Sequence, residues 1–363
     1  MRSENISYLP AVDQLRGIAA LWIICYHAFH LVSYRLDYGR PFAPDHWPIT
    51  INPLAAVLIE GHAAVGLFMV LSGYILTYGA WGHKIDYLNF LRNRLLRIYP
   101  LALFLIFFAA YSMPERFSWA GLWQTALLGH NLPGAFPGSP YTDMLWAVSV
   151  EFQFYLMFPL LCIILQRQKW KTFALMLFAF IVFRAVAVVL GANARDMSYL
   201  TIIGRLDQFL IGMMLGGWWR ESAPRLISAR WMLLVLTAWA IILVLFNNVG
   251  GWPATAAWKI LWPTIEALIS AAFIAAYLGS AHRLPAPLCA SLQRVGLASY
   301  SLYLVHMIAI TLILDHLLPA FSIDVAMPVI VVAIIFPAIF LLSAVTYFGI
   351  EKPFLSLRGR YLH

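Results

Sequence analysis

Apolar residues along this chain fall into ten long runs, each bounded by charged residues, proline or glycine and each near the length that a helix needs to cross a bilayer. The runs predict membrane-spanning helices near 11–32, 54–80, 95–113, 144–166, 172–191, 199–219, 231–248, 257–279, 297–318 and 325–350. We therefore expect an all-α polytopic membrane protein. It would form a single transmembrane domain over residues 1–363, with no appended soluble domain.

Composition supports this class and excludes others. Hydrophobic residues make up 62% of the 363 residues and charged residues 11%, which is not typical of a soluble globular protein. The three cysteines, Cys25, Cys162 and Cys289, are scattered without metal-ligand spacing, so we expect neither a disulfide framework nor a metal site. The net charge of +8 is spread over loops rather than gathered on one domain, so we expect no nucleic-acid partner.

The distribution of basic residues predicts the orientation of the chain. Fifteen Lys and Arg residues fall in the even-numbered loops and the C-terminal tail, against five in the odd-numbered loops. By the positive-inside rule both termini then face the cytoplasm, which agrees with an even number of spans. We expect a multi-pass protein of the cell inner (cytoplasmic) membrane, with the first span running outward.

The first predicted span carries ionisable residues that are costly inside a bilayer. Arg16 and His27 are eleven residues apart, which places them within about 20° of one helix face and about 16 Å apart along the axis. Each also has a simpler interpretation. Arg16 lies near a helix end and can extend its charge to the interface, and His27 can satisfy a hydrogen bond in a helix core.

Span direction sorts the buried polar residues into two layers. A cytoplasmic layer holds Arg16, Arg94 and Arg97, and an outer layer, roughly 8–12 Å below the far surface, holds His27, Glu151, Arg205, Asp207, Glu60 and His62. Guanidinium groups suit a polyphosphate, and a carboxylate beside a histidine suits a general base. Basic residues that only set topology, or a proton-coupled secondary transporter or exporter of a glycan or small molecule, would give a similar pattern. A transporter also predicts inverted halves, and the sequence has no such symmetry.

Six short stretches of the chain stand out in a fixed order. They are Asp13-Gln-Leu-Arg16-Gly-Ile-Ala-Ala with His27, Phe68-Met-Val-Leu-Ser72-Gly73-Tyr74, Arg94-Leu-Leu-Arg97-Ile-Tyr-Pro100, Trp146-Ala-Val-Ser-Val-Glu151-Phe-Gln153-Phe-Tyr155, Ser299-Tyr300-Ser301-Leu-Tyr303-Leu-Val-His306 and Glu351-Lys-Pro353-Phe. Together they resemble the motifs of the acyltransferase-3 family of integral-membrane O-acyltransferases. Two positions depart from the family pattern. Phe152 stands where a second Glu is common, and Gly66 where a polar residue often occurs.

The resemblance implies a membrane enzyme that moves an acyl group, usually acetyl, from cytoplasmic acyl-CoA to a hydroxyl of an extracytoplasmic or lipid-linked saccharide. Acyl-CoA would be a co-substrate, with no permanently bound cofactor. In this scheme Arg16, Arg94 and Arg97 bind the CoA phosphates, and His27 takes the proton of the acceptor hydroxyl while Glu151 orients the histidine ring.

The resemblance leaves other roles open. Ser72 and Tyr303 are candidate nucleophiles for an acyl-enzyme, although packing or hydrogen bonding is the favoured role for both. His306 can line a tunnel or make a structural hydrogen bond. We expect Arg205 and Asp207 to form a buried pair, with acceptor binding as the alternative role. His62 is a further candidate for the acceptor site.

Overall fold

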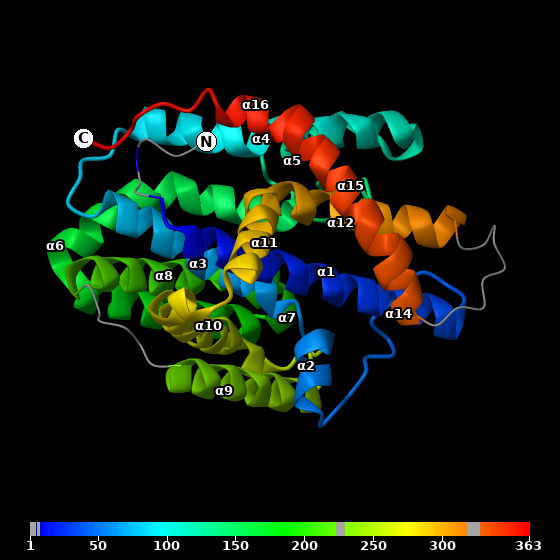
Figure 1. The fold of residues 1–363 in the computed structure, drawn as a ribbon, viewed down its shortest axis with the longest axis horizontal. Coiled ribbons are helices and arrows are strands. Elements are labelled where there is room, and N and C mark those ends of the chain that lie inside the picture. Colours follow the sequence, from blue (N-terminus) through cyan, green and yellow to red (C-terminus); the bar gives the residue numbers. More distant parts are fainter. Residues whose placement is uncertain (1–4, 6–7, 223–228, 318–326) are drawn as a thin grey trace.

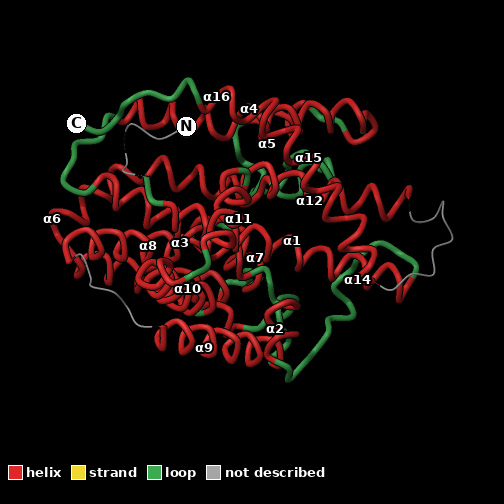
Figure 2. The backbone as a smooth tube through the Cα atoms, viewed as in Figure 1, coloured by secondary structure: helices red, strands yellow, loops and turns green. Residues whose placement is uncertain are grey.

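The computed structural model describes residues 5, 8–222, 229–317 and 327–363, and its regular structure is helical (Figures 1 and 2). The α-helices are α1 Pro10–Tyr38, α2 Pro53–Ile59, α3 Ala63–Ala80, α4 Tyr87–Ser112, α5 Trp119–Ala126, α6 Leu145–Val189, α7 Ala194–Leu200, α8 Ile202–Ser222, α9 Ala229–Asn248, α10 Trp262–Ser280, α11 Ala286–Leu297, α12 Ser299–Leu312, α14 Met327–Ile330, α15 Phe336–Thr346 and α16 Lys352–Leu355. Short 3-10 helices cover Pro114–Arg116, Ala257–Ile260 and Ala281–Arg283, and π-helical turns cover Ile313–Leu317, Val331–Ile335 and Tyr347–Glu351. The predicted all-α class is confirmed.

Nine helical segments of the described chain are long and apolar enough to cross a membrane. The remaining predicted span, 199–219, corresponds to α8, which is 21 residues long but carries Arg205 and Asp207 within its apolar sequence. A helix of this kind needs partners for its charges in neighbouring helices. The predicted end at residue 318 and the predicted start at 325–326 lie outside the described residues.

The predicted span 54–80 is wrong at one point, because the structure divides it into α2 and α3 at Glu60. The carboxylate of Glu60 accepts hydrogen bonds from Trp47 Nε1 at 2.8 Å and from Asn247 Nδ2 at 2.7 Å. Both donors lie outside this segment, so within it only the polar residues Glu60 and His62 mark the break. The separate turn of α2 packs against α9 instead of continuing α3 (Figure 1).

The helix α6 contains two predicted spans, and it must reverse direction between them. Phe154 stacks on Phe209 with 4.1 Å between ring centroids, while Arg184 donates to the carbonyl of Gly204 at 3.2 Å. Thirty residues of straight helix would separate Phe154 and Arg184 by about 45 Å, whereas Gly204 and Phe209 are about 8 Å apart along α8. Two limbs, Leu145–Gln168 and Trp170–Val189, therefore pack along the same side of the bundle.

Glycines hold α3 against α8 at backbone contact. A Cβ atom on Gly73 would lie 2.2 Å from the Phe209 carbonyl oxygen, and one on Gly212 would lie 2.0 Å from the Val70 carbonyl oxygen. This agrees with the close packing that small residues allow between membrane helices. The contact fixes the wall of α3 that faces α6 and α12.

Candidate active site

A cavity between α1, α3, α4, α6 and α12 brings together six residues that the sequence singled out, Tyr303 and the five polar residues named next. Its empty volume is about 830 Å³, and its polar lining includes Arg16, Ser72, Arg94, Arg97 and Glu151. We call it the arginine cavity. The six residues come from five helices, so only the tertiary fold makes them neighbours.

Of the arginines that line this cavity, only Arg16 forms an ion pair with a described residue. Arg16 contacts Asp13 at 3.2 Å, one turn earlier on α1. Arg94 and Arg97 make no ion pair with any described residue, and Arg94 lies over the ring of Tyr155 at 5.5 Å. A set of guanidinium groups at one cavity favours an anionic ligand with several oxygens.

A fourth arginine belongs to the same cationic cluster. Burial, together with the nearby guanidinium groups of Arg97, Arg94 and Arg16, lowers the pKa of Arg358 to about 10. Arg358 lies after α16 and counted only toward topology in the sequence, where nothing marks it as a neighbour of α1 and α4. The electrostatic repulsion among these groups is a physical reason for an anion to bind here.

Glu151 faces the arginine cavity from α6 and has its carboxylate held by two hydroxyl groups. Ser72 donates to Oε1 from α3, and Tyr155 donates to the same oxygen at 2.5 Å from the next turn of α6. The arrangement ties α3 to α6 at the cavity wall. The hydrogen bond agrees with the favoured role of Ser72, which is packing or hydrogen bonding.

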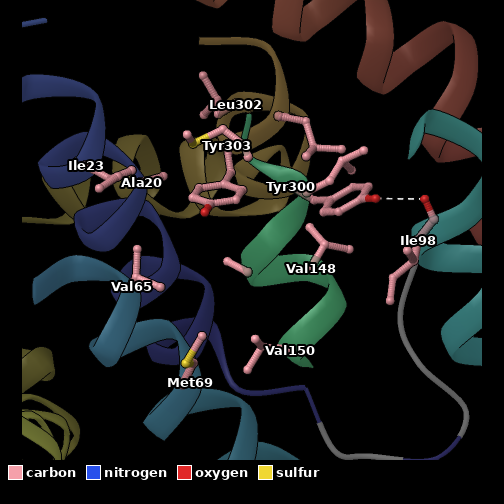
Figure 3. Close-up of a cluster of buried hydrophobic side chains, with 14 of the residues drawn as sticks. Ala20, Ile23, Val65, Met69, Ile98, Val148, Val150, Tyr300, Leu302 and Tyr303 are labelled. Carbon is pink, nitrogen blue, oxygen red and sulfur yellow. Dashed lines mark hydrogen bonds between the residues drawn. The ribbon is translucent and has the colours of Figure 1, made fainter. Parts of the chain in front are cut away.

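A second cavity, with an empty volume of about 730 Å³, contains His27. We call it the histidine cavity. Its walls are largely aromatic, and Trp146, Tyr199 and Trp252 are among the lining residues. Val65 and Tyr303 line both cavities, so the two spaces adjoin at these side chains. Figure 3 shows Tyr303 and Val65 in this part of the core.

The partner of the His27 ring is His306, and this corrects the expected pairing with Glu151. His306 Nε2 lies 2.9 Å from His27 Nδ1, whereas the hydrogen bonds of Glu151 go to Ser72 and Tyr155. Depth along a helix gives the height of a residue but not its direction around the axis. Glu151 and His27 consequently face different cavities.

The hydrogen bonds of His306 determine the tautomer of His27 when both rings are neutral. The Leu302 carbonyl oxygen, 3.1 Å from His306 Nδ1, can only accept, so Nδ1 of His306 carries the proton. Nε2 of His306 then accepts from His27 Nδ1. The remaining nitrogen of His27, Nε2, is therefore unprotonated and has the lone pair that a base needs.

The other outer-layer residues form a charged network around α8, and the expected Arg205–Asp207 pair is wrong. Arg205 pairs with Glu266 of α10 at 3.0 Å, and Asp207 pairs with Arg184 of α6 at 3.0 Å. All four side chains are buried. Residues two apart on a helix point in different directions, so Arg205 and Asp207 pair with residues of other helices.

His62 lies 3.4 Å from the carboxylate of Glu60 and lines a small pocket with Arg205 and Lys259. We call this small pocket the charged pocket. Tyr199 and Trp252 line both this pocket and the histidine cavity. The arginine cavity, the histidine cavity and the charged pocket thus follow one another through the protein. In the described part of the chain no group of three His, Cys, Asp or Glu side chains could hold a metal ion.

Comparison with known proteins gives the family. Residues 9–348 match the family model described as acyltransferase domain, Acyl_transf_3. O-acetyltransferase OatA of Staphylococcus aureus (strain NCTC 8325 / PS 47) is 27% identical over 274 residues, which cover 67% of this chain and 41% of OatA. Acyltransferase MdmB of Streptomyces mycarofaciens is 31% identical over 161 residues, or 42% of this chain and 38% of MdmB.

The putative peptidoglycan O-acetyltransferase YrhL of Bacillus subtilis (strain 168) is 25% identical over 191 residues, which cover 45% of this chain and 25% of YrhL. The chain therefore spans less than half the length of each of these three relatives. No solved structure matches it. Because the family model covers almost the whole chain, the protein belongs to the acyltransferase-3 family of integral-membrane proteins.

Proposed function

We propose that this protein is a membrane O-acyltransferase that moves an acyl group, acetyl in the simplest case, from acyl-CoA to a saccharide hydroxyl. One observation carries the proposal. A cavity lined by arginines adjoins a cavity that contains an available histidine nitrogen, and Tyr303 and Val65 separate the two. An anionic donor and a neutral, hydroxyl-bearing acceptor can thus approach one another from opposite ends.

The donor end is the arginine cavity. Arg16, Arg94, Arg97 and Arg358 supply guanidinium groups for the phosphates of CoA, and each can make paired, charge-assisted hydrogen bonds to phosphate oxygens. Arg16 and His27 lie about 16 Å apart along α1, a length comparable with an extended pantetheine arm. The thioester would then lie near Tyr303, between the two cavities.

The acceptor end is the histidine cavity. Its rings, including Trp146, Tyr199 and Trp252, offer flat apolar surfaces to the faces of a sugar ring. Two of the relatives carry names that refer to O-acetyl transfer, and one of these names peptidoglycan. A saccharide of the cell surface is therefore the acceptor class that we propose.

The reaction follows from the tautomer of His27. Nε2 of His27 takes the proton of the acceptor hydroxyl while the hydroxyl oxygen attacks the thioester carbon. The carbon–sulfur bond then breaks, and the CoA thiolate takes the proton from the His27 imidazolium. His306 positions the ring through Nδ1 throughout, and Glu151 holds the wall of the arginine cavity.

Orientation completes the proposal. With both termini on the cytoplasmic side, the arginine cavity opens toward cytoplasmic acyl-CoA and the histidine cavity toward the outer face of the inner membrane. The acyl group would cross about half of the roughly 30 Å hydrocarbon core while bound to the pantetheine arm.

The purified protein tests this function with acetyl-CoA and a peptidoglycan-derived saccharide. We expect release of free CoA together with a saccharide acetyl ester, measured by mass spectrometry, and stabilisation of the protein against heat by acetyl-CoA alone. A transporter would give neither result. Absence of both CoA release and thermal stabilisation would overturn the proposal.

A further inference from the structure

Tyr303 occupies the position where the two cavities adjoin. It lines both the arginine cavity and the histidine cavity. Among the described lining residues, Val65 alone shares this position. Tyr303 lies one helical turn before His306 on α12, and their ring centroids are 5.9 Å apart. Nε2 of His306 is in turn 2.9 Å from Nδ1 of His27. The tyrosine ring is thus adjacent to the histidine pair that holds the proposed base, His27.

The hydroxyl of Tyr303 is buried and has no hydrogen-bond partner among the described residues. Buried hydroxyls are nearly always hydrogen-bonded, so such a group calls for an explanation. Five other hydroxyls share this state, on Tyr74, Thr77, Ser198, Ser270 and Ser343, and none of these residues lines both cavities. Position therefore distinguishes Tyr303 from the rest.

A neighbouring tyrosine on the same helix provides a contrast. Tyr300 donates its hydroxyl to the Ile98 carbonyl oxygen of α4 at 2.7 Å. Figure 3 shows the two rings pointing to opposite sides, with Tyr300 toward Ile98 and Tyr303 toward Ala20 and Ile23 of α1. The hydroxyl of Tyr300 already joins two helices, whereas that of Tyr303 remains available to a ligand.

We propose that the Tyr303 hydroxyl donates a hydrogen bond to the carbonyl oxygen of the thioester and stabilises the oxyanion that forms there. This inference rests on the proposed function and adds a catalytic residue to it. When the acceptor oxygen bonds to the carbonyl carbon, the π electrons of the C=O bond move to the carbonyl oxygen, and the acceptor proton moves to His27 Nε2. The negative charge then faces the Tyr303 O–H.

Collapse of the intermediate restores the carbonyl group. The electron pair on oxygen re-forms the C=O bond, the C–S bond breaks, and the thiolate of CoA takes the proton from His27. Tyr303 keeps its own proton throughout. Its role differs from that of the acyl-enzyme nucleophile, because no bond forms between its oxygen and the acyl carbon.

The test compares Tyr303→Phe with Tyr300→Phe in the purified full chain, with acetyl-CoA and the saccharide acceptor. For Tyr303→Phe we expect kcat to fall about 10²–10³-fold, as for loss of one oxyanion donor, while KM for acetyl-CoA and the melting temperature are maintained. Tyr300 also lines the arginine cavity, so for Tyr300→Phe we expect a lower melting temperature and at most a higher KM for acetyl-CoA, with kcat per folded molecule near the wild-type value.

A CoA analogue with a trifluoromethyl ketone in place of the thioester adds a binding readout. Its hydrate is a tetrahedral gem-diol with an oxygen at the position of the oxyanion, so the wild type should bind it more tightly than CoA, and Tyr303→Phe should lose most of that gain. Wild-type kcat in Tyr303→Phe would overturn the inference, and so would a loss of kcat that Tyr300→Phe shares. In either case CoA release by the wild type would show that the proposed function stands, whereas no CoA release by the wild type would refute the function itself.

Discussion

The arginine cavity and the charged network around α8 both hold arginines inside the protein, but in contrasting surroundings. In the network, Arg205 faces Glu266 and Arg184 faces Asp207, each at 3.0 Å. In the arginine cavity, Arg94 and Arg97 line the open space and form no ion pair with a described residue. Paired cations join helices, whereas cations that share a cavity without carboxylate partners are available to an anionic ligand.

The difference also shows how to interpret buried charges in a membrane protein. An ionisable group within a bilayer suggests function by default, but its partner decides between catalysis, binding and structure. His27 follows the same rule, because His306 takes one of its nitrogens and leaves the other available. The following variants test each assignment, from the largest expected effect to the smallest.

Replacing the histidine should have the largest effect. His27→Gln can still donate to His306 but offers no basic nitrogen, so we expect turnover to fall about 10²–10⁴-fold with donor binding maintained. Turnover per folded molecule and acetyl-CoA affinity are measured separately. His46→Gln, at an exposed histidine stacked on Tyr38, is the matched control and should be active. Near-wild-type turnover of His27→Gln would refute the mechanism.

Breaking the charged network should act on stability instead. Glu266→Gln leaves the buried guanidinium of Arg205 without its counter-charge, which costs about 3–5 kcal/mol of stability. The double variant Arg205→Met with Glu266→Leu should recover much of the loss. Thermal unfolding in detergent measures both. If Arg97→Ala destabilised the protein as strongly as Glu266→Gln, the distinction between the two regions would fail.

Removing a cavity arginine should weaken donor binding without unfolding the protein. Arg97→Ala loses charge-assisted hydrogen bonds worth about 1.5–3 kcal/mol, so we expect acetyl-CoA affinity to fall about 10–100-fold. Arg97→Lys should restore only part of it, because an ammonium group cannot make the paired contact. Arg92→Ala, on the same helix but outside the cavity, is the control for binding titrations. Unchanged affinity in Arg97→Ala would assign this arginine to topology alone.

The smallest effect is expected from Ser72→Ala. Ser72 donates to Glu151, and Tyr155 still holds that carboxylate when the serine is replaced. We expect a loss of about 1 kcal/mol of stability and less than a tenfold loss of turnover. Intact-mass spectrometry of the wild type with acetyl-CoA alone should detect no acylated protein. An acyl adduct on Ser72, with an inactive Ser72→Ala variant, would replace direct transfer by an acyl-enzyme.

The sequence predicted the helical architecture because hydropathy acts along the chain. The two limbs of α6 appeared as separate apolar runs, although one helix connects them. The break at Glu60 was missed, because the apolar residues on either side outweigh Glu60 and His62 in hydropathy, and only the fold brings Trp47 and Asn247 to the Glu60 carboxylate. α1 also extends to Tyr38, beyond the predicted end, and Gly39 terminates it with a φ of 67°.

The sequence predicted how far along its helix each site residue lies, but not the side of the helix from which its side chain points. Depth arguments grouped Arg16, Arg94 and Arg97 correctly, because all three lie near the same ends of their helices. The same arguments paired His27 with Glu151 instead of His306, because sequence spacing does not give the rotation of one helix relative to another. Arg358 was missed because it follows the last helix and joins the cluster only in the folded protein.

The central claim is that donor and acceptor meet from opposite ends of one line of cavities. Proteoliposomes with the protein in one orientation test it, with orientation determined by thiol labelling of Ser139→Cys and Ser222→Cys in a cysteine-free background. Acetyl-CoA supplied only at the face of the arginine cavity should acetylate a saccharide enclosed on the other side. Two results would contradict the account. One is transfer only when both substrates are on the same side of the membrane, and the other is transfer only when acetyl-CoA is supplied at the face of the histidine cavity.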